Sequence, residues 1–219
     1  ASIKIPLLTL FALISFAGNS VLCRLALKTY AMDASQFTSV RLFSGAIILS
    51  LLLTFTNRSK SSTKIDRIKL TPRSVLTGFF LFAYAAFFSY AYILLDTATG
   101  ALILFATVQL TMITYQLFAY RSLSKHEVLG VTVALGGLIY WMMPDQNQPN
   151  LYGIGLMVLS GIAWGAYSIQ GKFSRNAQAE TAYNFLLSLP YLLLLLPIYL
   201  ATDSIERPLS IDGILMAVL

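Results

Sequence analysis

The sequence predicts an all-α protein, a polytopic membrane helix bundle built from inverted five-helix repeats. Of its 219 residues, 57% are hydrophobic and only 11% are charged, whereas a soluble domain is about half apolar and a quarter charged. The apolar residues fall in blocks close to the roughly 20 residues that a helix needs to cross a bilayer. The basic residues lie between these blocks, and a faint internal repeat links the two halves.

Seven apolar blocks predict spanning helices, and an eighth begins near Ser210. The seven lie at 5–28, 36–56, 72–95, 98–120, 126–143, 151–172 and 181–201. The first block is longer than a signal peptide and carries Asn19 and Arg24, so we expect it to remain as a helix.

Local signals support several of these boundaries. Thr71-Pro72 places a capping residue before a proline at the first position of the third helix. Ser124 and Glu127 have the spacing of a capping box at the start of the fifth helix. The segment 144–150, PDQNQPN, predicts a break before the sixth helix. Within that helix, Gly161 and Gly165 form a GxxxG pair that predicts close helix packing.

The charges between the helices predict the orientation. Cytoplasmic loops of membrane proteins are enriched in lysine and arginine. One side of the predicted bundle carries most of the basic residues: Lys4, Arg58, Lys60, Lys64, Arg67, Lys69, Arg73, Arg121, Lys125, Lys172 and Arg175. The other side carries Lys28 and Arg207. We therefore expect a cytoplasmic N-terminus in the cell's inner (cytoplasmic) membrane.

A weak repeat appears at an offset of 147 residues. It aligns Gly18 with Gly165, and the first two helices with the sixth and seventh. A repeat of five helices is odd in number, so its second copy must be inverted in the membrane, as in many secondary transporters. We expect a first repeat over 1–147 and an incomplete second repeat over 148–219.

Several function classes are disfavoured. The basic residues form no single face that would bind nucleic acid. Cys23 is the one cysteine and His126 the one histidine, so we expect neither a disulfide nor a metal site, and no cofactor. All nine acidic residues fall in loops or at helix ends, which argues against a membrane-embedded enzyme.

Polar and aromatic side chains inside the helices are the candidates for a substrate site. Arg41 and Arg24 either extend toward outer-leaflet headgroups or face a central cavity and attract a carboxylate or phosphate. Gln109 lies near the middle of the fourth helix, where pocket lining and interhelical hydrogen bonding are equally plausible. The candidate substrate-binding residues are Asn19, Arg41, Tyr84, Phe88, Tyr92, Gln109, Trp164 and Tyr167.

Three stretches resemble the EamA-type branch of the drug/metabolite transporter superfamily. FAGNSVLCRLAL (16–27) is similar to the family's WG-x-N segment with Ala17 in place of tryptophan, and Trp164-Gly165 keeps that pair in the second repeat. Arg41 is similar to an arginine that commonly opens the second helix, and 99–144 resembles the family's fourth and fifth helices. The chain departs from the family at Gln109, where a proline is common, and at Arg121, where a glutamate is common.

The resemblance implies ten helices with both termini in the cytoplasm. Together with the residues above, it favours an inner-membrane transporter that exports amino acids or similar small metabolites by alternating access. We expect a small-molecule substrate, a surrounding lipid bilayer, and a monomer or homodimer. The alternatives are a seven-helix receptor, which needs an extracellular N-terminus, and a membrane enzyme, which needs an intramembrane catalytic cluster.

Overall fold

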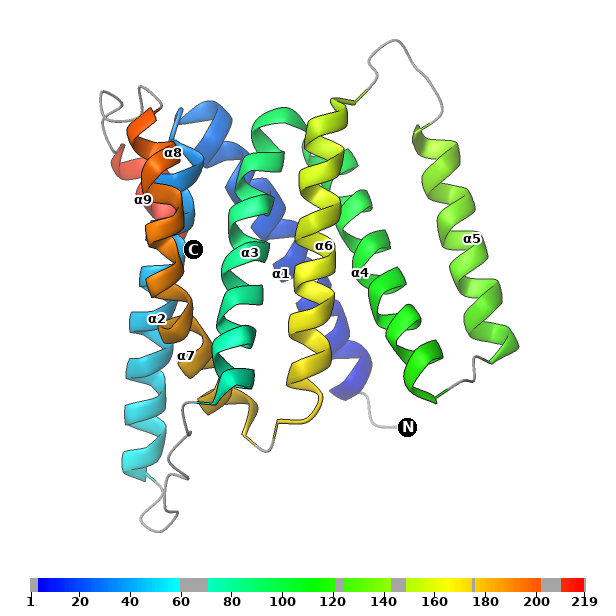
Figure 1. Cartoon of the computed structure of the whole chain (residues 1–219), viewed down its shortest axis with the longest axis horizontal. Coiled ribbons are helices and arrows are strands. Elements are labelled where there is room, and N and C mark those ends of the chain that lie inside the picture. The colour runs from blue at the N-terminus through cyan, green and yellow to red at the C-terminus, as the bar shows by residue number, and fades with distance from the viewer. Residues whose placement is uncertain are drawn as a thin grey trace.

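The structure is a bundle of helices that stand side by side (Figure 1). It is a computed structural model that describes residues 4–59, 71–120, 124–142, 149–174, 176–201 and 210–218. Every regular element in these residues is helical, as the sequence predicts. The elements are α1 (Lys4–Arg24), η1 (Leu25–Thr29), α2 (Ala34–Ser59), α3 (Pro72–Leu94), α4 (Thr97–Tyr120), α5 (Lys125–Met142), α6 (Leu151–Gly171), α7 (Ala177–Ser188), η2 (Leu189–Leu195), α8 (Leu196–Ala201) and α9 (Ile211–Val218).

The predicted capping signals are confirmed. The Thr71 hydroxyl accepts a hydrogen bond from the backbone N–H of Ser74, and Pro72 occupies the first turn of α3. The Glu127 carboxylate accepts from the backbone N–H of Ser124 at 2.7 Å, and the Ser124 hydroxyl accepts from the backbone N–H of Glu127 at 3.2 Å. These side chains satisfy N–H groups that a helix N-terminus otherwise leaves without partners.

Two of the predicted helices are less regular than expected. The first, predicted over 5–28, is α-helical to Arg24 and then widens into the π-helical turn η1. The seventh, predicted over 181–201, begins at Ala177 and changes to the 3-10 segment η2 after Ser188. Pro190 and Pro197 explain this second departure, because proline has no N–H to donate and its ring clashes with the carbonyl four residues earlier.

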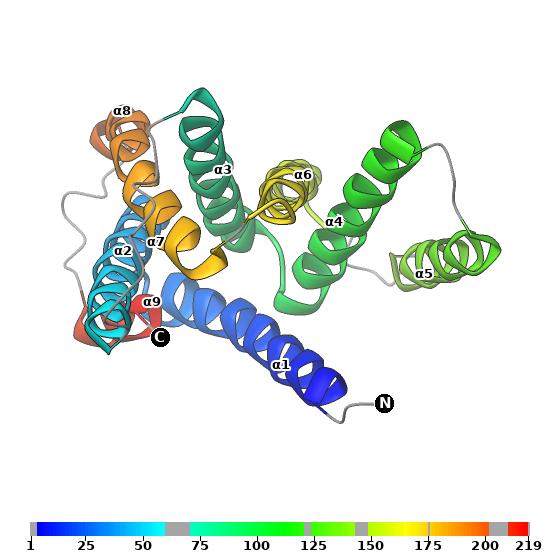
Figure 2. The ribbon, with the colours of Figure 1, turned by 90° about the horizontal axis from the view of Figure 1, so that it is seen from below.

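Helix α3 lies at the centre of the bundle and packs most extensively against α6, with α7 and α2 on its other side. Twelve of its residues are buried. Helix α4 packs against the opposite face of α6, and α5 follows α4 at the edge of the molecule (Figure 2). The predicted close packing of Gly161 and Gly165 is confirmed, because a Cβ atom added at either would lie within 2.8 Å of the Cβ atom of a threonine on α4.

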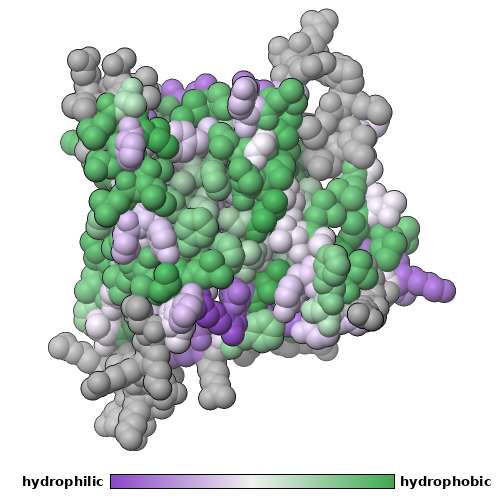
Figure 3. Space-filling model, in the orientation of Figure 1, coloured by the Kyte–Doolittle hydropathy of each residue, from purple (hydrophilic) through white to green (hydrophobic). Residues whose placement is uncertain are grey.

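The outer surface of the bundle suits a bilayer. Apolar side chains form a broad band across the face in Figure 3, and hydrophilic side chains gather near its lower edge. Six of the described helical segments are long and apolar enough to cross a membrane. The predicted fifth span forms α5 but is not among the six, because Lys125, His126 and Glu127 occupy its first turn. The membrane-spanning role of α5, and with it the total of seven spans, therefore stays a prediction.

Asp96 ends the short connection between α3 and α4. Its carboxylate accepts a hydrogen bond from the backbone N–H of Thr99 at 2.9 Å. Burial raises the pKa of the Asp96 carboxyl, but hydrogen bonds from Thr99 and from the backbone N–H groups of Asp96 and Ala98 together outweigh burial and hold that pKa below its ordinary value. Asp96 is therefore charged at neutral pH and caps the start of α4.

Candidate functional site

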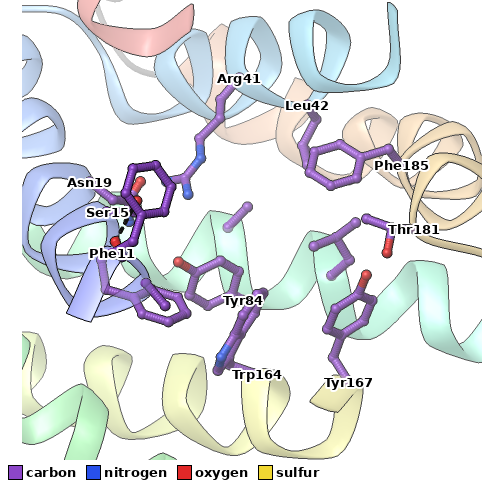
Figure 4. Close-up of a pocket in the computed structure, with 14 residues that line it drawn as sticks. Phe11, Ser15, Asn19, Arg41, Leu42, Tyr84, Trp164, Tyr167, Thr181 and Phe185 are labelled. Carbon is purple, nitrogen blue, oxygen red and sulfur yellow. Dashed lines mark hydrogen bonds between the residues drawn. The ribbon is translucent and has the colours of Figure 1, made fainter. Parts of the chain in front are cut away.

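A cavity of about 540 Å³ lies between α1, α2, α3, α6 and α7. Its volume falls within the range of small-molecule sites. Figure 4 shows side chains from all five helices turned toward one space. The lining residues are Phe11, Ala12, Ser15, Phe16, Asn19, Arg41, Leu42, Leu81, Tyr84, Ala85, Trp164, Tyr167, Thr181 and Phe185.

Arg41 enters this cavity from α2. Two hydrogen bonds between α2 and α3 fix the helix turns that precede it. The Thr38 hydroxyl donates to the Ser89 hydroxyl at 2.8 Å, and the Ser35 and Tyr90 hydroxyls lie 2.6 Å apart. Thr38 and Ser89 are both fully buried. Because Arg41 follows Thr38 by three residues, this polar contact sets the position from which the guanidinium reaches into the cavity.

The Arg41 guanidinium rests against aromatic rings. Its carbon atom lies 5.8 Å from the ring centroid of Tyr84 and 5.5 Å from that of Phe88. Both distances are within the range of a cation–π contact. The Nη1 atom is buried and has no hydrogen-bond partner among the residues that the structure describes.

Aromatic rings form the wall of the cavity opposite Arg41 (Figure 4). Tyr84 and Trp164 have ring centroids 4.6 Å apart, and Trp164 stacks on Tyr167 at 5.3 Å with an interplanar angle of 28°. Phe16 of α1 meets Trp164 edge to face. Such a wall offers an apolar aromatic surface to a ligand, and the Tyr84 and Tyr167 hydroxyls add polar groups.

A second cavity of about 200 Å³ adjoins the first on the side of α9. Three residues line both cavities, namely Asn19, Arg41 and Phe185. The second cavity also touches Met216, Ala217 and Val218 of α9. Arg41 therefore lies at the junction of two spaces inside the bundle.

Five of the eight candidate residues come together in the larger cavity: Asn19, Arg41, Tyr84, Trp164 and Tyr167. Phe88 and Tyr92 do not line it. Both are fully buried, Phe88 lies beside the Arg41 guanidinium, and Tyr92 packs edge to face on Phe88 with ring centroids 4.7 Å apart.

Gln109 lies away from this cavity. Its side chain is exposed on α4, and it is not among the lining residues. On the same face of α4, Gln116 donates a hydrogen bond to the Glu127 carboxylate of α5 at 3.2 Å. The polar face of α4 thus meets α5 at this end.

Arg24 has a structural role that differs from both roles considered for it. Its Nη1 atom donates hydrogen bonds to the backbone carbonyls of Tyr92, at 2.5 Å, and of Leu95. These carbonyls belong to the C-terminal end of α3, where helix carbonyls lack intrahelical partners. Arg24 therefore caps α3 and lines neither of the two cavities described above.

Sequence reasoning missed several lining residues. Phe11, Ser15 and Asn19 are spaced four residues apart and share one face of α1. Because Asn19 was already a candidate, this spacing could have identified Phe11 and Ser15 as candidates too. Thr181 and Phe185 have the same spacing on α7, and both lie within the helix predicted over 181–201.

The site shows no arrangement suited to a metal ion. Within the described ranges, no group of three or more histidine, cysteine, aspartate or glutamate side chains could hold one. The chemistry that the cavity offers is binding by one guanidinium, one amide, several hydroxyls and aromatic rings.

The fold and the cavity together define a multi-pass α-helical membrane protein with a cavity of small-molecule size inside its bundle. Comparison with known proteins places it more narrowly. The model of the EamA-like transporter family matches residues 3–143. The chain belongs to this family, which is part of the drug/metabolite transporter superfamily.

One curated relative is an uncharacterized protein of Pseudomonas aeruginosa. The two sequences are 44% identical over 190 residues, which cover 87% of this chain. The chain spans 63% of the length of that relative. No solved structure matches the chain with significance.

Proposed function

We propose that the protein is a secondary transporter of the inner membrane that exports amino acids or similar small metabolites by alternating access. The observation that carries this proposal is the cavity of about 540 Å³, lined by helices of both proposed repeats. Helices α1 to α3 belong to the first repeat and α6 and α7 to the second. Transporters built from inverted repeats bind substrate at the repeat interface near the bilayer midplane.

The directions of the helices support an inverted second repeat. In Figure 1, α1 runs from the lower edge of the bundle upward, and α6 runs from the upper edge downward. These two helices correspond in the proposed repeat, so the second copy has the opposite direction. Family membership adds support, because the matched family is one of transporters.

The proposed orientation places the lower edge of Figure 1 in the cytoplasm. The ends of α2, α4 and α6 that lie there precede the loops rich in lysine and arginine. Positive charge accumulates on the cytoplasmic side of membrane proteins. Helix α1 begins at the same edge.

Filling the cavity should block transport. Ala12 and Ala17 are both exposed residues of α1, but only Ala12 lines the cavity. We expect Ala12→Trp to slow transport about tenfold or more. The larger side chain would fill part of the cavity and displace the substrate, and a small displacement can lower a rate by a large factor. The measurement is counterflow of labelled amino acids and related organic acids by the full-length protein in liposomes.

Ala17→Trp is the matched control, and it should keep counterflow within about twofold of wild type, as expected for a substitution away from the site. Equal counterflow by both variants would show that the cavity is not the transport path. Absence of counterflow for every compound, from wild-type protein shown to be folded, would contradict the proposed function.

A further inference from the structure

The charge inside the larger cavity is unbalanced. Among the fourteen lining residues that the structure describes, Arg41 is the only charged side chain, and none is an aspartate or glutamate. The polar side chains drawn on the same side of the cavity as the guanidinium, Asn19 and Ser15, are neutral (Figure 4). A charge held in a space of low dielectric is costly unless an opposite charge joins it.

The Arg41 guanidinium is also short of acceptors. Its Nη1 atom is buried and lacks a partner in the described part of the chain, whereas Arg24 gives two hydrogen bonds to carbonyls. A buried donor without an acceptor loses the hydrogen bonds that it made to water. The rings of Tyr84 and Phe88 stabilise the cation but accept no conventional hydrogen bond from Nη1.

The rest of the cavity favours a planar apolar group. Tyr84, Trp164 and Tyr167 form a continuous aromatic wall, with neighbouring centroids 4.6 and 5.3 Å apart. Phe11, Phe16 and Phe185 complete the apolar lining. A ligand with one charged end and one flat apolar end would contact both Arg41 and this wall.

We propose that the substrate is an organic monocarboxylate with a planar apolar body, whose carboxylate binds Arg41. This inference rests on the proposed function and narrows its substrate class. A carboxylate matches the guanidinium in geometry and neutralises its single charge. An ammonium group would find no carboxylate among the described lining residues, and a phosphate dianion would leave one negative charge without a partner.

The ligand series tests the inference in wild-type protein. The probes are 3-phenylpropionate, its neutral amide, L-phenylalanine, phenethylamine and phenyl phosphate, which share a phenyl group and differ in charge. We expect 3-phenylpropionate to bind the purified full-length protein roughly tenfold tighter than each of the other four, because a hydrogen-bonded charge pair contributes about that factor. Equal binding of the amide, or tighter binding of L-phenylalanine, phenethylamine or phenyl phosphate, would overturn the proposal.

Variants test whether Arg41 binds the carboxylate. Arg41→Gln should weaken binding of 3-phenylpropionate roughly tenfold to a hundredfold and leave binding of the amide within about threefold. Arg41→Lys keeps the charge and should restore part of the affinity. Arg73→Gln is the control, because Arg73 is exposed at the start of α3, where it donates to the Gln170 side chain at 2.7 Å. An unchanged preference for the carboxylate in Arg41→Gln would overturn the proposal.

Counterflow separates this inference from the proposed function. Counterflow of amino acids that is equal in wild type and Arg41→Gln would overturn the inference and leave transport established. Protein that binds 3-phenylpropionate through Arg41 but moves no compound would support the anion site and contradict the transport function.

Discussion

At the residue scale, the two intramembrane arginines are used differently. Arg24 donates from its Nη1 atom to the carbonyls at the C-terminal end of α3, so this donor is satisfied inside the protein. Arg41 lies against two aromatic rings at the junction of two cavities, and its Nη1 atom lacks a partner among the described residues. One arginine therefore holds two helices together, and the other remains available to a ligand.

This difference predicts a stability effect for Arg24. Arg24→Met should lower the free energy of unfolding by about 2 kcal/mol, because it removes hydrogen bonds from a charged donor to two carbonyls. The measurement is a denaturing-detergent titration of the full-length protein in mixed micelles. Lys28→Met is the matched control, since Lys28 is exposed four residues beyond the end of α1, and it should change the free energy by less than about 0.5 kcal/mol. Similar losses in the two variants would count against the capping role.

At the scale of elements, the contact between α4 and α6 depends on glycine residues of α6, which have no side chain. A Cβ atom added at Gly161 would lie 2.6 Å from the Cβ atom of Thr107 and 3.1 Å from the backbone oxygen of Leu104. Small residues allow helix backbones to approach closely in membranes, where van der Waals packing drives association. Trp164 and Tyr167 lie on the same helix, so this contact also positions the aromatic wall.

Gly161→Ala should therefore destabilise the protein by about 1–3 kcal/mol through overpacking. Gly155 lies on the same helix with no atom within 4 Å of its added Cβ. Gly155→Ala should be neutral or stabilise by roughly 0.5–1 kcal/mol, because alanine favours the helix. Thermal unfolding in detergent would compare the two, and a Gly161→Ala variant as stable as Gly155→Ala would disprove the close contact.

At the scale of the whole molecule, the distribution of charge predicts the topology. Lys125 begins α5 at one edge of the bundle, and Leu151 begins α6 at the other edge, where it is 81% exposed. Because the basic loops adjoin the first edge, we expect that edge to lie in the cytoplasm and the second to lie outside. The single cysteine, Cys23, is fully buried.

A pair of cysteine variants in a Cys23→Ala background should report this topology. A membrane-impermeant maleimide should label Leu151→Cys in intact cells and label Lys125→Cys only after the membrane is permeabilised. The reverse pattern would place the N-terminus outside the cell and contradict the proposed orientation. It would also return the receptor alternative to consideration.

The sequence by itself determined the class of fold and most helix positions, because apolar blocks of membrane-spanning length must form helices to satisfy their backbone in lipid. The starts of α3 and α5 could also be predicted, because capping is a local interaction. The residues that indicate them are Thr71 and Pro72 for α3, and Ser124 and Glu127 for α5. The π-helical turn before Tyr30 and the 3-10 segment after Ser188 needed the structure.

Only the tertiary structure decided which polar residues share a cavity. From the sequence, Arg24 and Arg41 were equivalent candidates for facing the cavity, and so were Gln109 and Trp164, because each lies within a predicted span. Packing directed Arg24 to the end of α3 and left Gln109 exposed, while it brought Arg41 and Trp164 to one cavity. Helical period gives the face on which a residue lies, but the neighbour of that face depends on contacts between helices far apart in the sequence.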